Sequence, residues 1–297
     1  METSEYLKAI LADQDLKDDS AELKNLRESR KEVESVLRDA FPGAAPRIQY
    51  AGSYKKGSLN REAYDLDIAF FLPEGDDGAG ETLEDIYNNT RNALATKYVV
   101  ESKRSALRLM VQSGSVKSYL HIDVVPGRFT DGSDGDCFLY QANAEKCRLK
   151  TNIGVHVEHI RDSGVVPAIR LLKLWKVRRY LSMKQFVLEL LIVQELSGLR
   201  QKPLEEQLIH FWEIVRDAEN PIWVEDPANP RGNDLSSLVT EAWYELSSAA
   251  GTVLQQIDTQ GWESVFGPLS KAGNVDEKLR AAAASVSVSS QTRPWLP

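Results

Sequence analysis

The pattern of hydrophobic and polar positions divides the chain into two halves. Up to about residue 150, an N-terminal stretch with helical spacing is followed by short apolar runs of strand length. Beyond residue 153, nearly every segment repeats its apolar residues at helical spacing. The pattern therefore predicts an α+β fold with two parts: a mixed helix and strand unit over 1–150 and a helical lobe over 151–297.

The individual elements follow from these periods and from the Pro and Gly residues between them. Residues 3–40 are expected to form one long helix or a broken pair. Further elements of the first half are strands at 47–51, 65–72, 98–101, 106–112, 116–125 and 137–141, and a helix at 81–97. Helices of the second half are expected at 153–162, 165–181, 184–198, 204–218, 234–256 and 275–288, with a long proline-rich connection at 221–233.

Two carboxylates stand out within the apolar strands. Asp65 and Asp67 lie two residues apart, so both point to one face while Leu66 and Ile68 point to the other. Adjacent carboxylates in a largely buried strand repel each other and lose hydration, and divalent cations offset both costs. Asp123, near the end of another predicted strand, would complete the three carboxylates that a two-metal phosphoryl-transfer site needs.

The pair alone is a weak signal, because a chain with 44 acidic residues contains several acidic-x-acidic triplets by chance. The loop before the strand adds to it. Gly52 lets the backbone approach a ligand closely, and Ser53 adds a hydroxyl donor beside the backbone N–H groups. Such a loop is by itself an ordinary turn. The order of Gly-Ser, a short spacer, Asp-x-Asp and a distant strand carboxylate favours a nucleotidyltransferase site.

Composition and charge narrow the classes of partner. The chain of 297 residues has a formal charge of −8, which disfavours broad binding along a nucleic-acid duplex. The acidic N-terminal stretch does not resemble a secretory signal, and no apolar run is long enough for a membrane span. Two cysteines exclude a disulfide framework and fit a reducing cytoplasm. The Cys and His spacings do not match a structural zinc site.

The same residues resemble a known superfamily. The combination of Gly52-Ser53, Asp65-x-Asp67 and Asp123 is similar to the signature of the DNA polymerase β-like nucleotidyltransferases. Within it, several stretches resemble the bacterial CD-NTases, which are relatives of cyclic GMP-AMP synthase and oligoadenylate synthase. The stretches are GSYKKGS, DLDIAFF, HIDVVPG, RLLKLWKVRR followed by KQFVLELL, and EDPANPRGN. They cover about two-thirds of the chain.

The resemblance implies a bilobal fold, with a nucleotidyltransferase core braced by a long N-terminal helix and an oligoadenylate synthase-like helical lobe. It implies that Asp65, Asp67 and Asp123 hold two Mg²⁺ ions, or Mn²⁺ in their place. It also implies that Gly52 and Ser53 contact the donor triphosphate, and that Lys173 reaches it from the helical lobe. At Gln185 the family often has a phosphate-binding Ser, and a Gln amide could still donate to phosphate. Glu189, in an apolar helix, is expected to be paired structurally.

The implied activity is the joining of ribonucleoside triphosphates, ATP and GTP among them, into a cyclic di- or trinucleotide second messenger. In this family the product activates a separate effector in bacterial anti-phage signalling, without a requirement for nucleic acid. A linear or RNA 3′-end nucleotidyltransferase is the second interpretation. A catalytically silent nucleotide-binding module is the third. The sequence leaves open the bases, the linkage, the ring size, the trigger and the oligomeric state.

Overall fold

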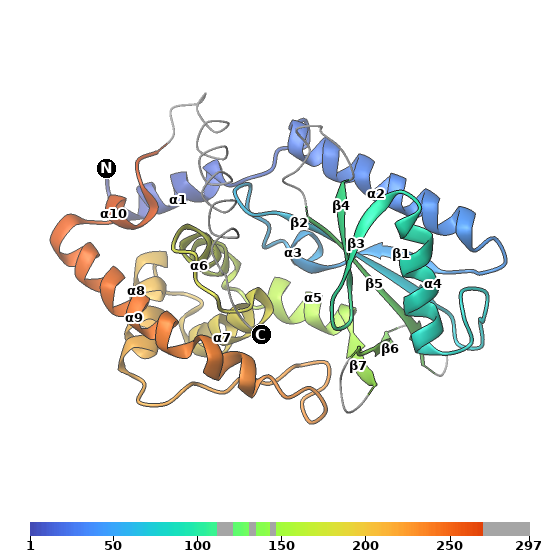
Figure 1. Cartoon of the computed structure of the whole chain (residues 1–297). Coiled ribbons are helices and arrows are strands. Elements are labelled where there is room, and N and C mark those ends of the chain that lie inside the picture. The colour runs from blue at the N-terminus through green and yellow to red at the C-terminus, as the bar shows by residue number, and fades with distance from the viewer. Residues whose placement is uncertain (112–120, 131–134, 143–146, 270–297) are drawn as a thin grey trace, which may run out of the picture.

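Two lobes make up the computed structural model, which describes residues 1–111, 121–130, 135–142 and 147–269 (Figure 1). The first part contains α1 (Thr3–Asp13), α2 (Ala21–Ala40), β1 (Arg47–Tyr50), α3 (Gly52–Lys56), β2 (Asp65–Leu72), α4 (Leu83–Ala95), β3 (Tyr98–Ser102), β4 (Leu107–Val111), β5 (His121–Phe129), β6 (Asp136–Tyr140) and β7 (Arg148–Asn152). The helical part contains α5 (Ile153–Arg161), α6 (Val166–Arg178), α7 (Gln185–Leu196), the 3₁₀ turn η1 (Ser197–Leu199), α8 (Leu204–Asp217), α9 (Ser236–Gln260) and α10 (Glu263–Phe266).

Most predicted elements have a counterpart within about two residues at their ends. The predicted helix at 275–288 and the first part of the strand at 116–125 lie outside the described residues. The strand that carries Asp123 runs on to Phe129, beyond Pro126, because its later residues still pair with β2 and β6. β7 and α10 were not predicted, and the predicted Gly-Ser loop begins with a short helix, α3. None of the helices described is long and apolar enough to cross a bilayer.

The expected single long N-terminal helix is wrong, and the broken pair is correct. The polar segment 14–20 separates α1 from α2, and the Ser20 hydroxyl caps α2 by accepting from the backbone N–H of Leu23 at 3.2 Å. The two helices serve different cores. Tyr6 and Leu7 of α1 pack in the helical lobe, whereas Leu26 of α2 packs on the sheet. One straight helix could not bury both apolar faces.

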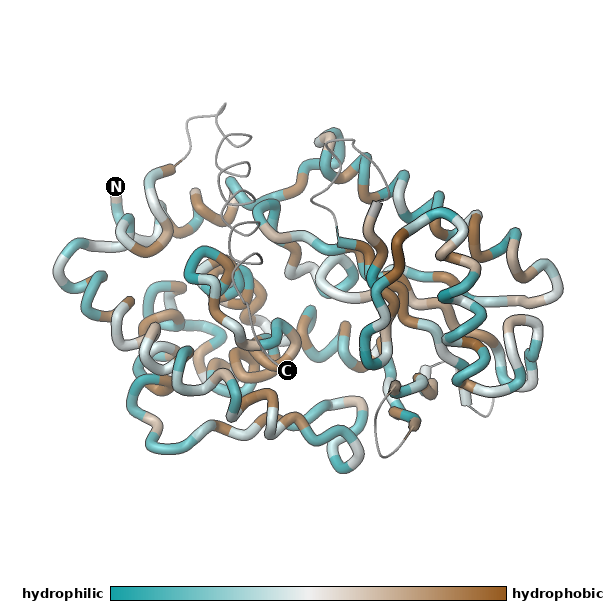
Figure 2. Tube along the Cα trace, in the orientation of Figure 1, coloured by the Kyte–Doolittle hydropathy of each residue, from teal (hydrophilic) through white to brown (hydrophobic). Residues whose placement is uncertain are grey.

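The seven-stranded sheet has the order β1-β2-β5-β4-β3, with β6 beside β5 and β7 beside β6. Strands β2 and β5 run parallel at its centre, and the other pairs are antiparallel. One face carries Leu66, Ile68 and Phe70, which pack against α2 and α4. Figure 2 shows the hydrophobic segments concentrated in the strands and in the interior of the helical lobe. The opposite face of β2 is therefore the one left for chemistry.

The predicted connection at 221–233 is fastened to α5 by one buried carboxylate. Asp226, only 1% exposed, is 2.6 Å from His156 Nε2 on α5. It also accepts from the backbone N–H of Ala228 at 2.9 Å and from Asn233 Nδ2 at 2.7 Å. Burial by itself raises the pKa of Asp226. The hydrogen bonds from these three partners and the charge of His156 outweigh burial, so the pKa lies below its ordinary value.

Replacing Asp226 with Ala is expected to lower the unfolding free energy by about 3 kcal/mol, because three partly buried groups lose their acceptor. Urea unfolding followed by tryptophan fluorescence would measure the change. The matched control is Asp234→Ala, which removes an exposed carboxylate of the same connection that accepts from the backbone N–H of Ser236. Equal unfolding midpoints for the two variants would contradict the anchoring role of Asp226.

Candidate active site

The three predicted carboxylates come together on one face of the two central strands. Asp67 of β2 is directly opposite Asp123 of β5 in the parallel ladder, and Asp65 is opposite His121. Side chains alternate along a strand, so these four share the face turned away from Leu66 and Ile68. The alternation in burial along β2, with Leu66 and Ile68 fully buried and the two aspartates only partly, agrees with this.

Gly52 packs directly against the carboxylate of Asp67. A Cβ atom at position 52 would sit 1.6 Å from Asp67 Oδ2, and the residue has φ +57°, a conformation that favours glycine. The backbone N–H of Ala51 donates to the carbonyl of Asp67 at 2.8 Å, which ties the loop to the strand. The Gly-Ser loop and the Asp-x-Asp strand therefore form one packed unit.

The charge at this unit is only partly compensated. Burial, followed by the neighbouring charges of Asp65 and Asp123, raises the pKa of Asp67 to about 6. Lys56 opposes the change but does not cancel it. A carboxylate whose pKa is raised by burial and by two neighbouring carboxylates marks a place where a cation would be stabilised.

Arg108 of β4 is the residue that sequence reasoning missed. Its Nε donates to Asp123 Oδ1 at 2.9 Å and its Nη2 donates to Asp123 Oδ2 at 2.7 Å, a two-pronged ion pair. His121 Nδ1 lies 3.5 Å from Asp65 Oδ1, and this contact raises the pKa of His121. The sequence feature that could have identified Arg108 is a single cation between Leu107 and Leu109 in an apolar strand.

The three carboxylates fit a divalent cation by their chemistry, because Mg²⁺ prefers carboxylate oxygens. The raised pKa of Asp67 and the close packing of its carboxylate on Gly52 agree with that fit. Within the described part of the chain, however, no three acidic, His or Cys side chains stand ready as a metal cluster. Arg108 holds both oxygens of Asp123, so that carboxylate must share or release this contact to join the others.

The remaining predicted site residues gather around Ser53. Lys173 Nζ donates to Ser53 Oγ at 2.8 Å, and Gln185 Nε2 donates to the same oxygen at 2.8 Å. Lys173 is only 2% exposed and is also bound to Glu189, whose carboxylate pairs with Lys56 as well. The structural pairing expected for Glu189 is therefore confirmed. Lys173 and Gln185 both reach the Gly-Ser loop from the helical lobe.

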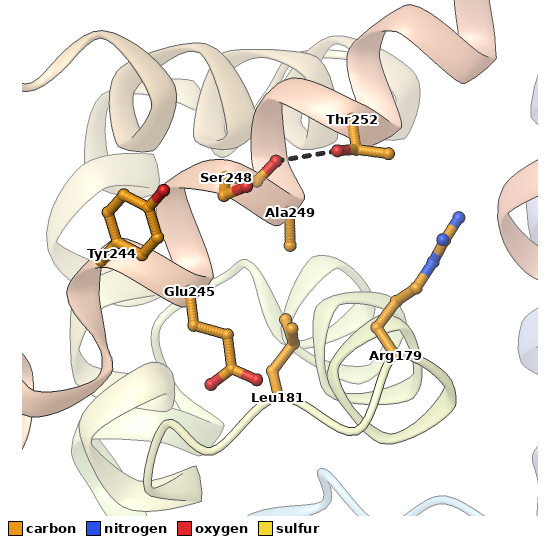
Figure 3. A pocket seen from close by; sticks show the side chains of 7 residues that line it. All are labelled: Arg179, Leu181, Tyr244, Glu245, Ser248, Ala249 and Thr252. Atoms are coloured by element: carbon orange, nitrogen blue, oxygen red, sulfur yellow. Dashed lines mark hydrogen bonds between the residues drawn. The ribbon is translucent and has the colours of Figure 1, made fainter.

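A separate pocket of about 400 Å³ opens in the helical lobe between the end of α6 and α9 (Figure 3). Its lining comprises Arg179, Leu181, Tyr244, Glu245, Ser248, Ala249 and Thr252. Glu245 accepts from the backbone N–H of Ser182 at 2.8 Å, and the Tyr244 ring is 87% exposed. None of the three carboxylates lines this pocket, so it is distinct from the site on the sheet.

Comparison with known sequences finds neither a matching protein-family model nor a matching curated protein. Comparison with solved structures finds extensive similarity. The chain superposes on CdnG of Bradyrhizobium diazoefficiens, a CD-NTase solved with GTP, at a TM-score of 0.67 and 13% identity, over 95% of this chain and 98% of that one.

Two further structures agree. CdnC of E. coli MS115-1, solved in complex with HORMA-deltaN, matches at a TM-score of 0.63 and 18% identity, over 90% of this chain and 97% of that one. The Vibrio cholerae cyclic AMP-GMP synthase DncV, solved with nonhydrolyzable GTP, matches at 0.61 and 15% identity, over 91% and 82%. At these identities the likeness establishes the fold, which is that of the bacterial CD-NTases.

Proposed function

We propose that the chain is a metal-dependent nucleotidyltransferase that joins ribonucleoside triphosphates into a cyclic di- or trinucleotide. The observation that carries the proposal is the meeting of Asp65, Asp67 and Asp123 on adjacent parallel strands, with Gly52-Ser53 packed against Asp67. The CD-NTase fold supports it, as do the ATP and GTP complexes of the similar structures. An effector activated by the product, in anti-phage signalling, belongs to the same proposal.

In this proposal, two groups of residues have different roles, one at the metal ions and one at the triphosphate. Asp65, Asp67 and Asp123 would hold the divalent cations, Mg²⁺ or Mn²⁺. Bound cations would neutralise triphosphate charge and lower the pKa of an attacking ribose hydroxyl. Gly52 and Ser53, backed by Lys173 and Gln185, would bind the donor triphosphate. Most of the rate acceleration would come from positioning and from charge neutralisation, since the chain supplies no covalent step.

The test is incubation of the purified protein with all four ribonucleoside triphosphates and Mg²⁺, followed by phosphatase treatment and mass spectrometry. A phosphatase-resistant product with the mass of a cyclic di- or trinucleotide is expected. The double variant Asp65→Asn with Asp67→Asn should make none. Asp217→Asn, which alters an exposed ion pair with Arg216 in the helical lobe, should behave as wild type.

Other outcomes would redirect the assignment. Linear products would favour oligonucleotide or RNA 3′-end extension, which the charge of −8 disfavours. Nucleotide binding without any product, with Mg²⁺ or Mn²⁺ and with added RNA or DNA, would favour a silent nucleotide-binding module. The three carboxylates on one face support an enzyme over the silent module, and they are equally compatible with cyclic and linear products.

A further inference from the structure

Lys173 has no N–H left for a ligand. Its ammonium group carries three hydrogens. These are shared among Ser53 Oγ at 2.8 Å, the carbonyl of Ser58 at 2.7 Å, Ser58 Oγ at 3.1 Å and Glu189 Oε1 at 3.0 Å. The side chain is also buried, with 2% of the residue exposed. A phosphate group could touch this ammonium only after the network around it had been taken apart.

The network that surrounds Lys173 is charged and complete. Glu189, 1% exposed, accepts from Lys173 and Ser58 at one oxygen and from Lys56 at the other, 2.7 Å away. Burial raises the pKa of Glu189, but the two lysines outweigh it and bring the value to about 2. Removing Glu189 from this cluster would leave the two buried lysines without their shared counter-charge. We therefore treat Lys173, Lys56, Glu189 and Ser58 as a buried cluster that holds the Lys173 side chain in one position.

Ser53 is the residue through which this buried cluster contacts the Gly-Ser segment. A hydroxyl oxygen has two lone pairs and one hydrogen. Lys173 and Gln185 each donate to Ser53 Oγ at 2.8 Å, so both lone pairs are occupied. Among the described residues, the Ser53 hydroxyl donates to none. Ser53 directly follows Gly52, the residue that packs against the carboxylate of Asp67.

We infer that Lys173 and Gln185 are positioning residues that act on the donor triphosphate through Ser53. By filling both lone pairs of Ser53 Oγ, they leave its hydrogen as the only group it can offer, and this hydrogen donates to a phosphate oxygen. Glu189 holds Lys173 in place for this purpose. The inference rests on the proposed function, because it assigns the way in which that site holds its substrate.

The position of Gln185 gains a physical reason from this arrangement. A Gln side chain is two bonds longer than a Ser side chain, and here it spans from the first turn of α7 to Ser53 Oγ. The amide is therefore used within the protein. Ser53 Oγ thus has two protein donors, and triphosphate binding passes through this one hydroxyl.

The test is a pair of double-mutant cycles read as nucleotide affinity. The probes are ATP and GTP analogues with a non-hydrolysable α–β bridge, titrated calorimetrically in Mg²⁺ into wild type, Ser53→Ala, Gln185→Met, Lys173→Met and the two double variants. Ser53→Ala should weaken binding about tenfold. Gln185→Met should weaken binding about threefold in wild type and leave the Ser53→Ala protein unchanged. The loss from Lys173→Met should be at least about threefold smaller in the Ser53→Ala background.

Controls keep the result interpretable. Methionine matches the length of the glutamine side chain and is one atom shorter than lysine, and Lys173→Met leaves Lys56 and Glu189 as a balanced pair. Gln207→Met is the matched control, because Gln207 is a buried amide of the same lobe that donates to the carbonyl of Lys202. It should leave affinity unchanged in either background. Circular dichroism and melting curves confirm that each variant is folded.

One contrary outcome is that Lys173→Met and Gln185→Met each weaken nucleotide binding by the same factor in wild type and in Ser53→Ala. That result would mean that Lys173 and Gln185 contact the nucleotide directly. It would overturn the inference and leave the proposed function standing. Coupling at Gln185 with none at Lys173 would overturn it for Lys173. Wild-type protein that binds neither analogue would overturn the proposed function and the inference together. Affinity measurements thus separate the two failures.

Discussion

Asp67→Asn is expected to abolish nucleotide transfer while making the metal-free protein more stable above pH 6. The carboxylate of Asp67 is packed on Gly52 beside Asp65 and Asp123, and its charge is opposed by burial and by both neighbours. The Asn side chain has the same shape without the charge. Transfer should fall at least about 100-fold, since a central group that holds charge at the site is removed.

The sign of the stability change follows from proton linkage. The pKa of Asp67 is about 6 in the folded protein, against an ordinary value of 3.8 for an aspartate. Between these values the folded state binds more protons than the unfolded state, so the unfolding free energy falls as the pH rises. Above pH 6 the full cost is present, about 3 kcal/mol for a difference of about two pKa units. The Asn side chain carries no charge and so avoids this cost. The difference in unfolding free energy between the variant and wild type should therefore grow from about pH 4 to pH 6 and stay at its full value above pH 6.

Urea unfolding in EDTA at pH 4, 5, 6 and 7 would measure this gain, with product formation at pH 7 as the second readout. Asp217→Asn is the control, because its exposed carboxylate lies far from the sheet face and pairs with Arg216. A variant that is less stable than wild type at pH 7 would show that the Asp67 charge is compensated in solution. Retained activity would remove Asp67 from the catalytic group.

Sequence reasoning located the three carboxylates because local rules were sufficient. Alternation along a strand places Asp65 and Asp67 on one face whatever the rest of the chain does. The apolar run around Asp123 predicted a second buried strand, and β2 and β5 do lie side by side. What the sequence did not contain was their register, which depends on pairing across more than 50 residues. The direct opposition of Asp67 and Asp123 is a result of that register.

The partners of the site residues were harder to predict, for the same reason. Arg108 meets Asp123 only because β4 and β5 pair in one register, which places them opposite each other. Lys56 and Glu189 are 133 positions apart, and their ion pair exists only after the helical lobe has packed on α3. An isolated charge in an apolar segment predicts that a partner exists. It does not identify the partner.

The broken N-terminal helix shows a related limit. The apolar spacing over 3–40 was compatible with one helix or two, and local propensity could not decide. The decision comes from tertiary structure, because Gln14 is 1% exposed and bonds through its side chain to Glu62 in the loop before β2. That contact fixes the break between α1 and α2. It also connects the N-terminal region to the loop that precedes β2.

Gly52→Ala is expected to disrupt the site more than any substitution that leaves the charges intact. The new methyl carbon would lie 1.6 Å from Asp67 Oδ2, so either the loop or the carboxylate must move. The φ of +57° adds a backbone cost of about 1–2 kcal/mol for a residue with a Cβ. Because a small misplacement at a reacting centre is costly, transfer should fall by about 100-fold or more.

The matched control for this substitution is Gly57→Ala in the same loop. Gly57 also has a left-handed backbone, with φ +71°, but nothing lies within 4 Å of the position its Cβ would take. Both variants therefore carry the same kind of backbone cost, and only Gly52→Ala collides with Asp67. Product formation and melting temperature, measured side by side, should show a stability loss in both and the loss of transfer in Gly52→Ala alone. Equal activity in the two variants would mean that Asp67 does not need its contact with the Gly-Ser loop, and the loop and strand would then have to be treated as separate parts of the site.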